Sequence, residues 1–164
     1  CRHEGTLFPM TLGSDEFDKA GARALFEQSG CDGPQALVVY ENFAPGSTPR
    51  EKLTYALTDV MFRNSMVRIL DAAALWGTPC WGWICAWETD LPGLRATHAI
   101  ELPFIWDWIN DPTLESMQTF AGAGAPSALG RAMREYWVNF ARSGTPTAMG
   151  EPDWPQYDTG RRLY

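Results

Sequence analysis

Residues 80–88, CWGWICAWE, are an apolar stretch of strand length in a chain whose other patterns are mostly helical. Such a run, preceded by Thr78-Pro79 and followed by a loop, predicts a β-strand buried on both faces. A lone buried strand leaves unpaired N–H and C=O groups along both edges, and folded proteins do not leave these groups bare. We therefore expect further strands beside it, contributed by sequence that lies outside these 164 residues.

Most of the remaining chain carries helical periodicity and helix-end residues. Residues 34–44 are ambiguous between strand and helix. Ser14 is a candidate cap for the first helix, and Gly30, Gly77 and Gly144 follow expected helix ends. Helices are expected over residues 14–29, from Arg50 onward, over about 65–76, within 114–124 and over 126–144.

Composition narrows the class of protein. The chain is 45% hydrophobic and 20% charged, as in a globular domain or a large piece of one, and its net charge of −7 argues against a nucleic-acid partner. No window reaches the roughly 20 apolar residues of a membrane span. Only two histidines occur, without H-E-x-x-H spacing, so no metal or other cofactor is expected. The four cysteines lack CxxC spacing and leave the compartment, cytoplasmic or secreted, open.

Two loops carry the candidate chemistry. RATHAIELPFIW, residues 95–106, places His98 just beyond the expected strand, where open α/β sheets hold functional groups. A histidine base needs a partner that fixes its orientation, and Glu4, followed by the turn-permitting Gly5, is the candidate. Taken singly, a structural histidine and a solvated glutamate remain the alternative interpretations.

Four stretches together resemble the type B carboxylesterases, the family that includes the cholinesterases. RHEGTLF is similar to the family's acidic motif, and RATHAIELPFIW is similar to its histidine motif. Residues 57–74 resemble the helix before the last strands, and residues 136–158 resemble the C-terminal signature. The family's order is kept from residue 1 to about residue 160. His3, Arg95-Ala96-Thr97 and Ser65 depart from the usual pattern.

The resemblance implies an α/β class, with residues 1–164 as the C-terminal portion of one type B carboxylesterase domain of the α/β-hydrolase fold. This portion would be mostly helical, with one or a few central sheet strands. Glu4 and His98 would be the acid and the general base of a Ser-Glu-His triad. Triads of this fold run serine, acid, histidine along the chain. No G-x-S-x-G occurs here, so the serine and the oxyanion hole are expected upstream of residue 1.

Roles are also expected for residues near His98 and for partners. Glu101 is expected to support the site by hydrogen bonding, and the substrate would be a small carboxylic ester. The oligomeric state stays open. An inactive, cholinesterase-like binding or adhesion domain is the alternative function, and a truncated product without function is a third. Four aromatic residues are candidates for a substrate pocket, with core packing as the alternative: Trp83, Trp87, Phe104 and Trp106.

Overall fold

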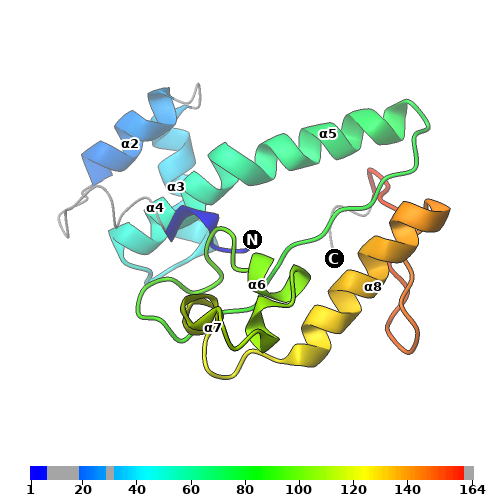
Figure 1. The fold of residues 1–164 in the computed structure, drawn as a ribbon. Coiled ribbons are helices and arrows are strands. Elements are labelled where there is room, and N and C mark those ends of the chain that lie inside the picture. The colour runs from blue at the N-terminus through cyan, green and yellow to red at the C-terminus, as the bar shows by residue number, and fades with distance from the viewer. Residues whose placement is uncertain (7–18, 29–31, 161–164) are drawn as a thin grey trace.

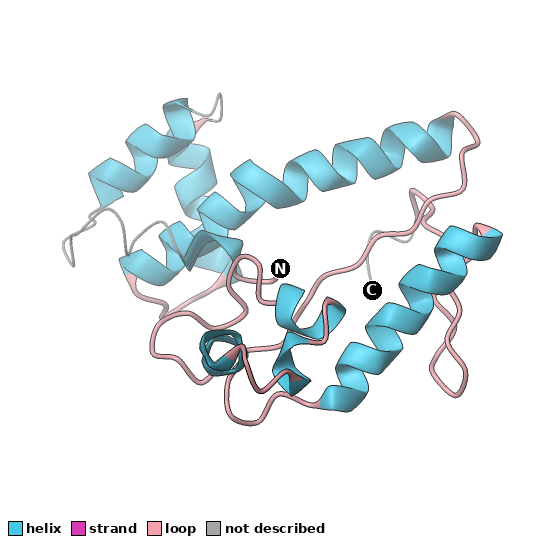
Figure 2. Ribbon diagram, viewed as in Figure 1, coloured by secondary structure: helices cyan, strands magenta, loops and turns pink. Residues whose placement is uncertain are grey.

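The computed structural model describes residues 1–6, 19–28 and 32–160. Within these ranges the chain is helical or irregular and contains no β-strand (Figure 2). In chain order the elements (Figure 1) are η1 (Glu4–Thr6), α2 (Lys19–Gln28), α3 (Gly33–Phe43), α4 (Pro49–Thr58), η2 (Asp59–Arg63), α5 (Asn64–Leu75), α6 (Leu102–Ile105), η3 (Trp108–Asn110), α7 (Glu115–Ala121) and α8 (Ser127–Ser143).

Local sequence signals explain where several helices begin and end. Helix α4 starts with Pro49 after a capping box, in which Thr48 and Glu51 each bond the other's backbone N–H. The ambiguous segment 34–44 is mostly helix α3, whose cap Asp32 accepts a hydrogen bond from the N–H of Gln35. Helix α8 ends at Gly144, which has a φ of 77°. The expected helices are confirmed, except that residues 14–18 and 29 of the first, with its candidate cap Ser14 and the following Gly30, lie outside the described ranges.

A five-residue π-helix, η2, joins α4 to α5. Asp59 at its start accepts a hydrogen bond from the Tyr40 hydroxyl at 2.7 Å and pairs with Arg63 at 2.6 Å. Single π-turns inside helices are frequent at functional sites, because the extra residue redirects the side chains that follow. Here Phe62 of η2 lies against the ring of His98, with 5.4 Å between the ring centroids.

The expected strand over residues 80–88 is not confirmed. These residues form an extended but unpaired segment that crosses between α5 and α8 (Figure 1). Its carbonyls accept hydrogen bonds from the N–H of Arg2 at Cys85 and from the N–H of Tyr157 at Cys80, both at 2.8 Å. No described segment continues such bonds into a ladder, so the pairing that defines a strand does not form. The N–H groups of residues 81–86 meet no acceptor among the described residues.

Two apolar clusters hold the described elements together. One contains Phe104 of α6 and Met133 of α8, with Trp87 donating its indole N–H to the carbonyl of Ala121 at 2.8 Å. The other joins Phe26 of α2 to Ala56 of α4. The first cluster fixes α6, and with it the loop before α6 that carries His98. None of the helices in the described ranges has both the length and the apolar character needed to cross a membrane.

Candidate active site

Glu4 is held by a short turn that sits directly on α4. Glu4 is 7% exposed. The N–H of the next residue, Gly5, donates to the Thr58 hydroxyl of α4 at 2.9 Å. A Cβ at Gly5 would stand 2.4 Å from the carbonyl oxygen of Thr54, so no larger residue fits without movement. The glycine is required by this close approach to α4, which is a different reason from the backbone turn that the sequence suggested.

His98 lies in a turn that contains two residues with left-handed backbone conformations. Arg95 has a φ of 54° and Ala99 has a φ of 65°, a conformation that is uncommon outside glycine. The N–H of His3 donates to the carbonyl of Ala96 at 2.9 Å, which ties this turn to the one that carries Glu4. Helix α6 follows at once. The two loops are therefore joined through their backbones next to both candidate catalytic residues.

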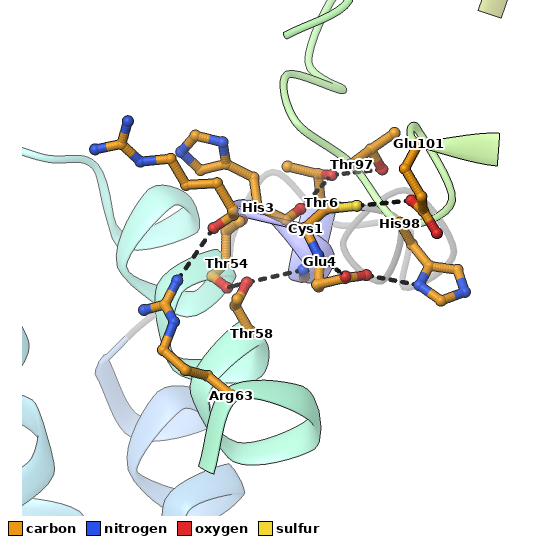
Figure 3. Close-up of polar contacts among 12 residues, drawn as sticks. Cys1, His3, Glu4, Thr6, Thr54, Thr58, Arg63, Thr97, His98 and Glu101 are labelled. Carbon is orange, nitrogen blue, oxygen red and sulfur yellow. Dashed lines mark hydrogen bonds and ion pairs between the residues drawn. The ribbon is translucent and has the colours of Figure 1, made fainter. Parts of the chain in front are cut away.

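The side chains of Glu4 and His98 meet although they are 94 positions apart. His98 Nδ1 lies 2.6 Å from Glu4 Oε2 (Figure 3). The second carboxylate oxygen accepts from the backbone nitrogen of Cys1. An ionised carboxylate can only accept hydrogen bonds, so in the neutral ring Nδ1 carries the proton and Nε2 holds a free lone pair. The His98 side chain is 51% exposed, which leaves room for a reacting group at Nε2.

Glu101 lies beside this pair. Its Oε2 accepts a hydrogen bond from the Cys1 thiol at 2.9 Å, and among the described residues it has no hydrogen bond to His98 (Figure 3). The supporting role expected for Glu101 stays a prediction, and the contact through which it would act is the one to residue 1.

The four candidate pocket aromatics do not line one pocket, although Trp83 and Trp87 both pack against the core cluster that contains Phe104. Trp83 lines an apolar cavity of about 430 Å³ that also borders Glu4 and Phe62. Trp87 and Phe104 pack into the core, and Phe104 is fully buried. Trp106 is 62% exposed and does not line that cavity. Their role in substrate binding stays a prediction, for which the position of Trp83 is the most favourable.

His3 has the opposite environment from His98. It is 2% exposed, and its buried Nδ1 has no hydrogen-bond partner among the described residues. Burial, together with the nearby Arg95 guanidinium, lowers the pKa of His3 from 6.5 to about 4. The Glu88 carboxylate lies 3.8 Å away and opposes this shift. The sequence marked His3 only as a departure from the family pattern.

Sequence reasoning missed the threonines that surround the site. Thr58 is 1% exposed and Thr97 is fully buried, and both bond to the loop that carries Glu4. A buried hydroxyl has no periodic signature, so the sequence held no signal for these contacts beyond their nearness to Glu4 and His98. Within the described ranges, no three His, Cys, Asp or Glu side chains gather as a metal site.

A histidine that bonds a buried carboxylate through one ring nitrogen is the arrangement that nucleophile–histidine–acid triads use. The model of the Carboxylesterase family matches residues 37–164, which include His98 and exclude Glu4. The chain therefore belongs to the carboxylesterase family.

Three relatives illustrate the similarity. Human "Cocaine esterase" is 34% identical over 73 residues, 41% of this chain and 11% of that protein. Mouse "Acylcarnitine hydrolase" is 38% identical over 72 residues, again 41% and 11%. "Fatty acyl-CoA hydrolase precursor, medium chain" from Anas platyrhynchos is 38% identical over 69 residues, 42% of this chain and 11% of that protein. The matched part thus spans about a tenth of each relative's length.

Proposed function

We propose that this chain supplies the acid and the general base of a carboxylic-ester hydrolase. The observation that carries the proposal is the 2.6 Å contact between His98 Nδ1 and Glu4 Oε2. In this role His98 Nε2 takes the proton from a serine hydroxyl as the hydroxyl attacks the ester carbonyl, and then gives it to the leaving alcohol. His98 next activates the water that hydrolyses the acyl-enzyme. Glu4 orients the ring and stabilises the imidazolium.

The serine and the oxyanion-binding N–H groups are proposed to come from sequence that precedes Cys1. Residues 1–164 would then be the C-terminal portion of one α/β-hydrolase domain. The unpaired N–H groups of residues 81–86 support this division, because they lack acceptors among the described residues and would find them in neighbouring strands. On this proposal the extended segment becomes a sheet strand only in the longer chain.

The substrate is proposed to be a small ester with an apolar group. The cavity of about 430 Å³ beside Glu4 is lined mainly by apolar side chains, among them Met61, Phe62 and Trp83. The printed names of the relatives, an esterase and two acyl-group hydrolases, are in keeping with acyl substrates. An apolar wall near the histidine would hold such a group.

The test uses the chain extended upstream to include the residues that precede Cys1. We expect it to hydrolyse p-nitrophenyl butyrate, and we expect His98→Asn to lower kcat by about 10³-fold or more. Asparagine has no basic nitrogen, so it cannot take the proton. Its side-chain N–H can still donate to Glu4, so the fold should be preserved. Thr113→Val, at an exposed position remote from the site, is the control for the substitution itself and keeps full activity.

Two outcomes contradict the proposal. A folded, longer chain without ester hydrolysis would favour the inactive binding domain instead. Serine-dependent turnover by residues 1–164 alone would show that the nucleophile lies within this chain. Thermal melting of each variant separates loss of the base from loss of the fold.

A further inference from the structure

The loops that carry Glu4 and His98 are joined by two buried hydroxyls. Thr6 Oγ1 lies 2.8 Å from Thr97 Oγ1 and 2.8 Å from the carbonyl oxygen of His3 (Figure 3). Thr97 is 0% exposed and Thr6 is 7% exposed, so water does not compete for these contacts. Thr97 is the residue directly before His98, and Thr6 is two residues after Glu4.

The direction of the two hydrogen bonds follows from counting protons. A carbonyl oxygen can only accept, so the single proton of the Thr6 hydroxyl points to His3. The Thr6 oxygen must then accept from Thr97, whose own hydroxyl donates. The result is a directed chain from Thr97 through Thr6 to the His3 carbonyl. Each bond in such a chain polarises and strengthens the next, most of all away from water.

We propose that Thr97 is a positioning residue that sets the distance between His98 and Glu4, and we base this on the proposed hydrolase function. Its hydroxyl does not touch a reacting atom. It acts by holding the turn before His98 against the turn of Glu4, in parallel with the backbone bond from His3 to Ala96 at 2.9 Å. Two links on one side of the pair restrict sliding of one loop over the other.

The need for such a link follows from the shape of the His98 turn. Arg95 and Ala99 both adopt left-handed backbone conformations, which cost energy in residues that carry a side chain. The His98 ring itself is half exposed, and apart from Glu4 its ring contact is with Phe62. A strained turn with an exposed side chain keeps one position only where the surrounding contacts fix it. Next to His98, the Thr97 hydroxyl makes such a contact, and it is buried.

The experiment compares Thr97→Val with Thr97→Ser in the chain extended upstream of Cys1. Valine keeps the shape and removes the hydroxyl, whereas serine keeps the hydroxyl and removes a methyl group. Thr89→Val is the matched control, since Thr89 is also buried and its hydroxyl accepts from the Leu91 N–H, away from the pair. Two measurements are made: the steady-state kinetics of p-nitrophenyl butyrate hydrolysis, which give kcat and KM, and the ¹H resonance of the proton on His98 Nδ1.

We expect Thr97→Val to lower kcat by roughly tenfold to a hundredfold with KM within about twofold, because small displacements of a catalytic group cost rate more than binding. The Nδ1 proton should move upfield as its bond to Glu4 lengthens. Thr97→Ser should restore both quantities, and Thr89→Val should change neither. If Thr97→Val does not fold, Thr6→Val tests the same link from the other loop.

Unchanged kcat and an unchanged resonance in folded Thr97→Val would overturn the inference. Equal effects from Thr97→Val and Thr89→Val would also overturn it, because they would report general destabilisation. The resonance does not require turnover, so a shifted proton in a protein that hydrolyses no ester would uphold the positioning role and reject the hydrolase function. The two proposals can therefore fail separately.

Discussion

The two histidines of this chain lie on adjoining loops in opposite environments. His98 is half exposed, bonds a carboxylate through Nδ1 and leaves Nε2 open. His3 is buried, lacks a partner for Nδ1 among the described residues, and has its pKa lowered to about 4. The backbone hydrogen bond from the His3 N–H to the carbonyl of Ala96 and the contact between the Thr6 and Thr97 hydroxyls join the two loops. Residue type alone therefore says little about proton transfer, whereas the partner and the exposure decide it.

The largest expected effect on kcat comes from neutralising the carboxylate beside His98. The same change at the carboxylate beside His3 is the comparison. Glu4→Gln should lower kcat by about 10³-fold, because the amide no longer stabilises the imidazolium. Glu88→Gln, the same change at the carboxylate 3.8 Å from His3, should leave kcat within about threefold. Ester hydrolysis by the chain extended upstream of Cys1 measures both. Equal losses would mean that the two histidine sites are not functionally distinct.

Adding one methyl group at Gly5 should disrupt the packing of the Glu4 loop on α4. Gly5→Ala places a Cβ 2.4 Å from the Thr54 carbonyl oxygen and should cost about 2–3 kcal/mol of stability through displacement of the loop. Gly124→Ala is the matched control, because an added Cβ there meets nothing within 4 Å. Urea unfolding measures both variants. A neutral Gly5→Ala would show that the contact is easily relieved.

Acid should destabilise the protein through His3. The unfolded chain takes up this proton near pH 6.5 and the folded chain only near 4, so the contribution is complete above pH 6.5 and is lost as pH falls towards 4. The loss should be about 3 kcal/mol. His3→Gln, which cannot be protonated, should show a flatter dependence of the unfolding free energy over the same range. Parallel curves for the two proteins would contradict the buried, neutral state of His3.

The smallest effect is expected at Glu101. Its carboxylate bonds the Cys1 thiol at 2.9 Å and does not bond His98. We expect Glu101→Gln to change kcat by less than about threefold, since an amide oxygen still accepts from the thiol. Kinetics on p-nitrophenyl butyrate decide the point, and a loss comparable to that of Glu4→Gln would move Glu101 into direct catalysis.

Much of the site was predictable because its signals are local motifs. His98 and Glu4 were expected as a pair from their motifs and their order, and the structure places their side chains 2.6 Å apart. Periodicity and end residues predicted α4, α5 and α8. The segment 34–44 was ambiguous because it is short and apolar, and the Asp32 cap that favours helix lies outside it.

Features that depend on contacts between distant segments were not predictable. The lowered pKa of His3 depends on its burial and on Arg95, far along the chain, and the reason for Gly5 is a carbonyl of α4. The expected strand over residues 80–88 is not confirmed, for a similar reason. Apolar composition predicts that a segment is buried, but strand formation also requires a neighbour to pair with.

The row of N–H groups along residues 81–86 has a consequence for how this protein is made. An extended apolar stretch whose N–H groups meet no acceptor in the described part of the chain is a template for any other chain that can add a strand, including a second copy. The amount of soluble protein recovered from a cell should then depend on how quickly this edge is covered after synthesis. That dependence is a matter of rates and chaperone supply, so yield and melting temperature need not rise or fall together.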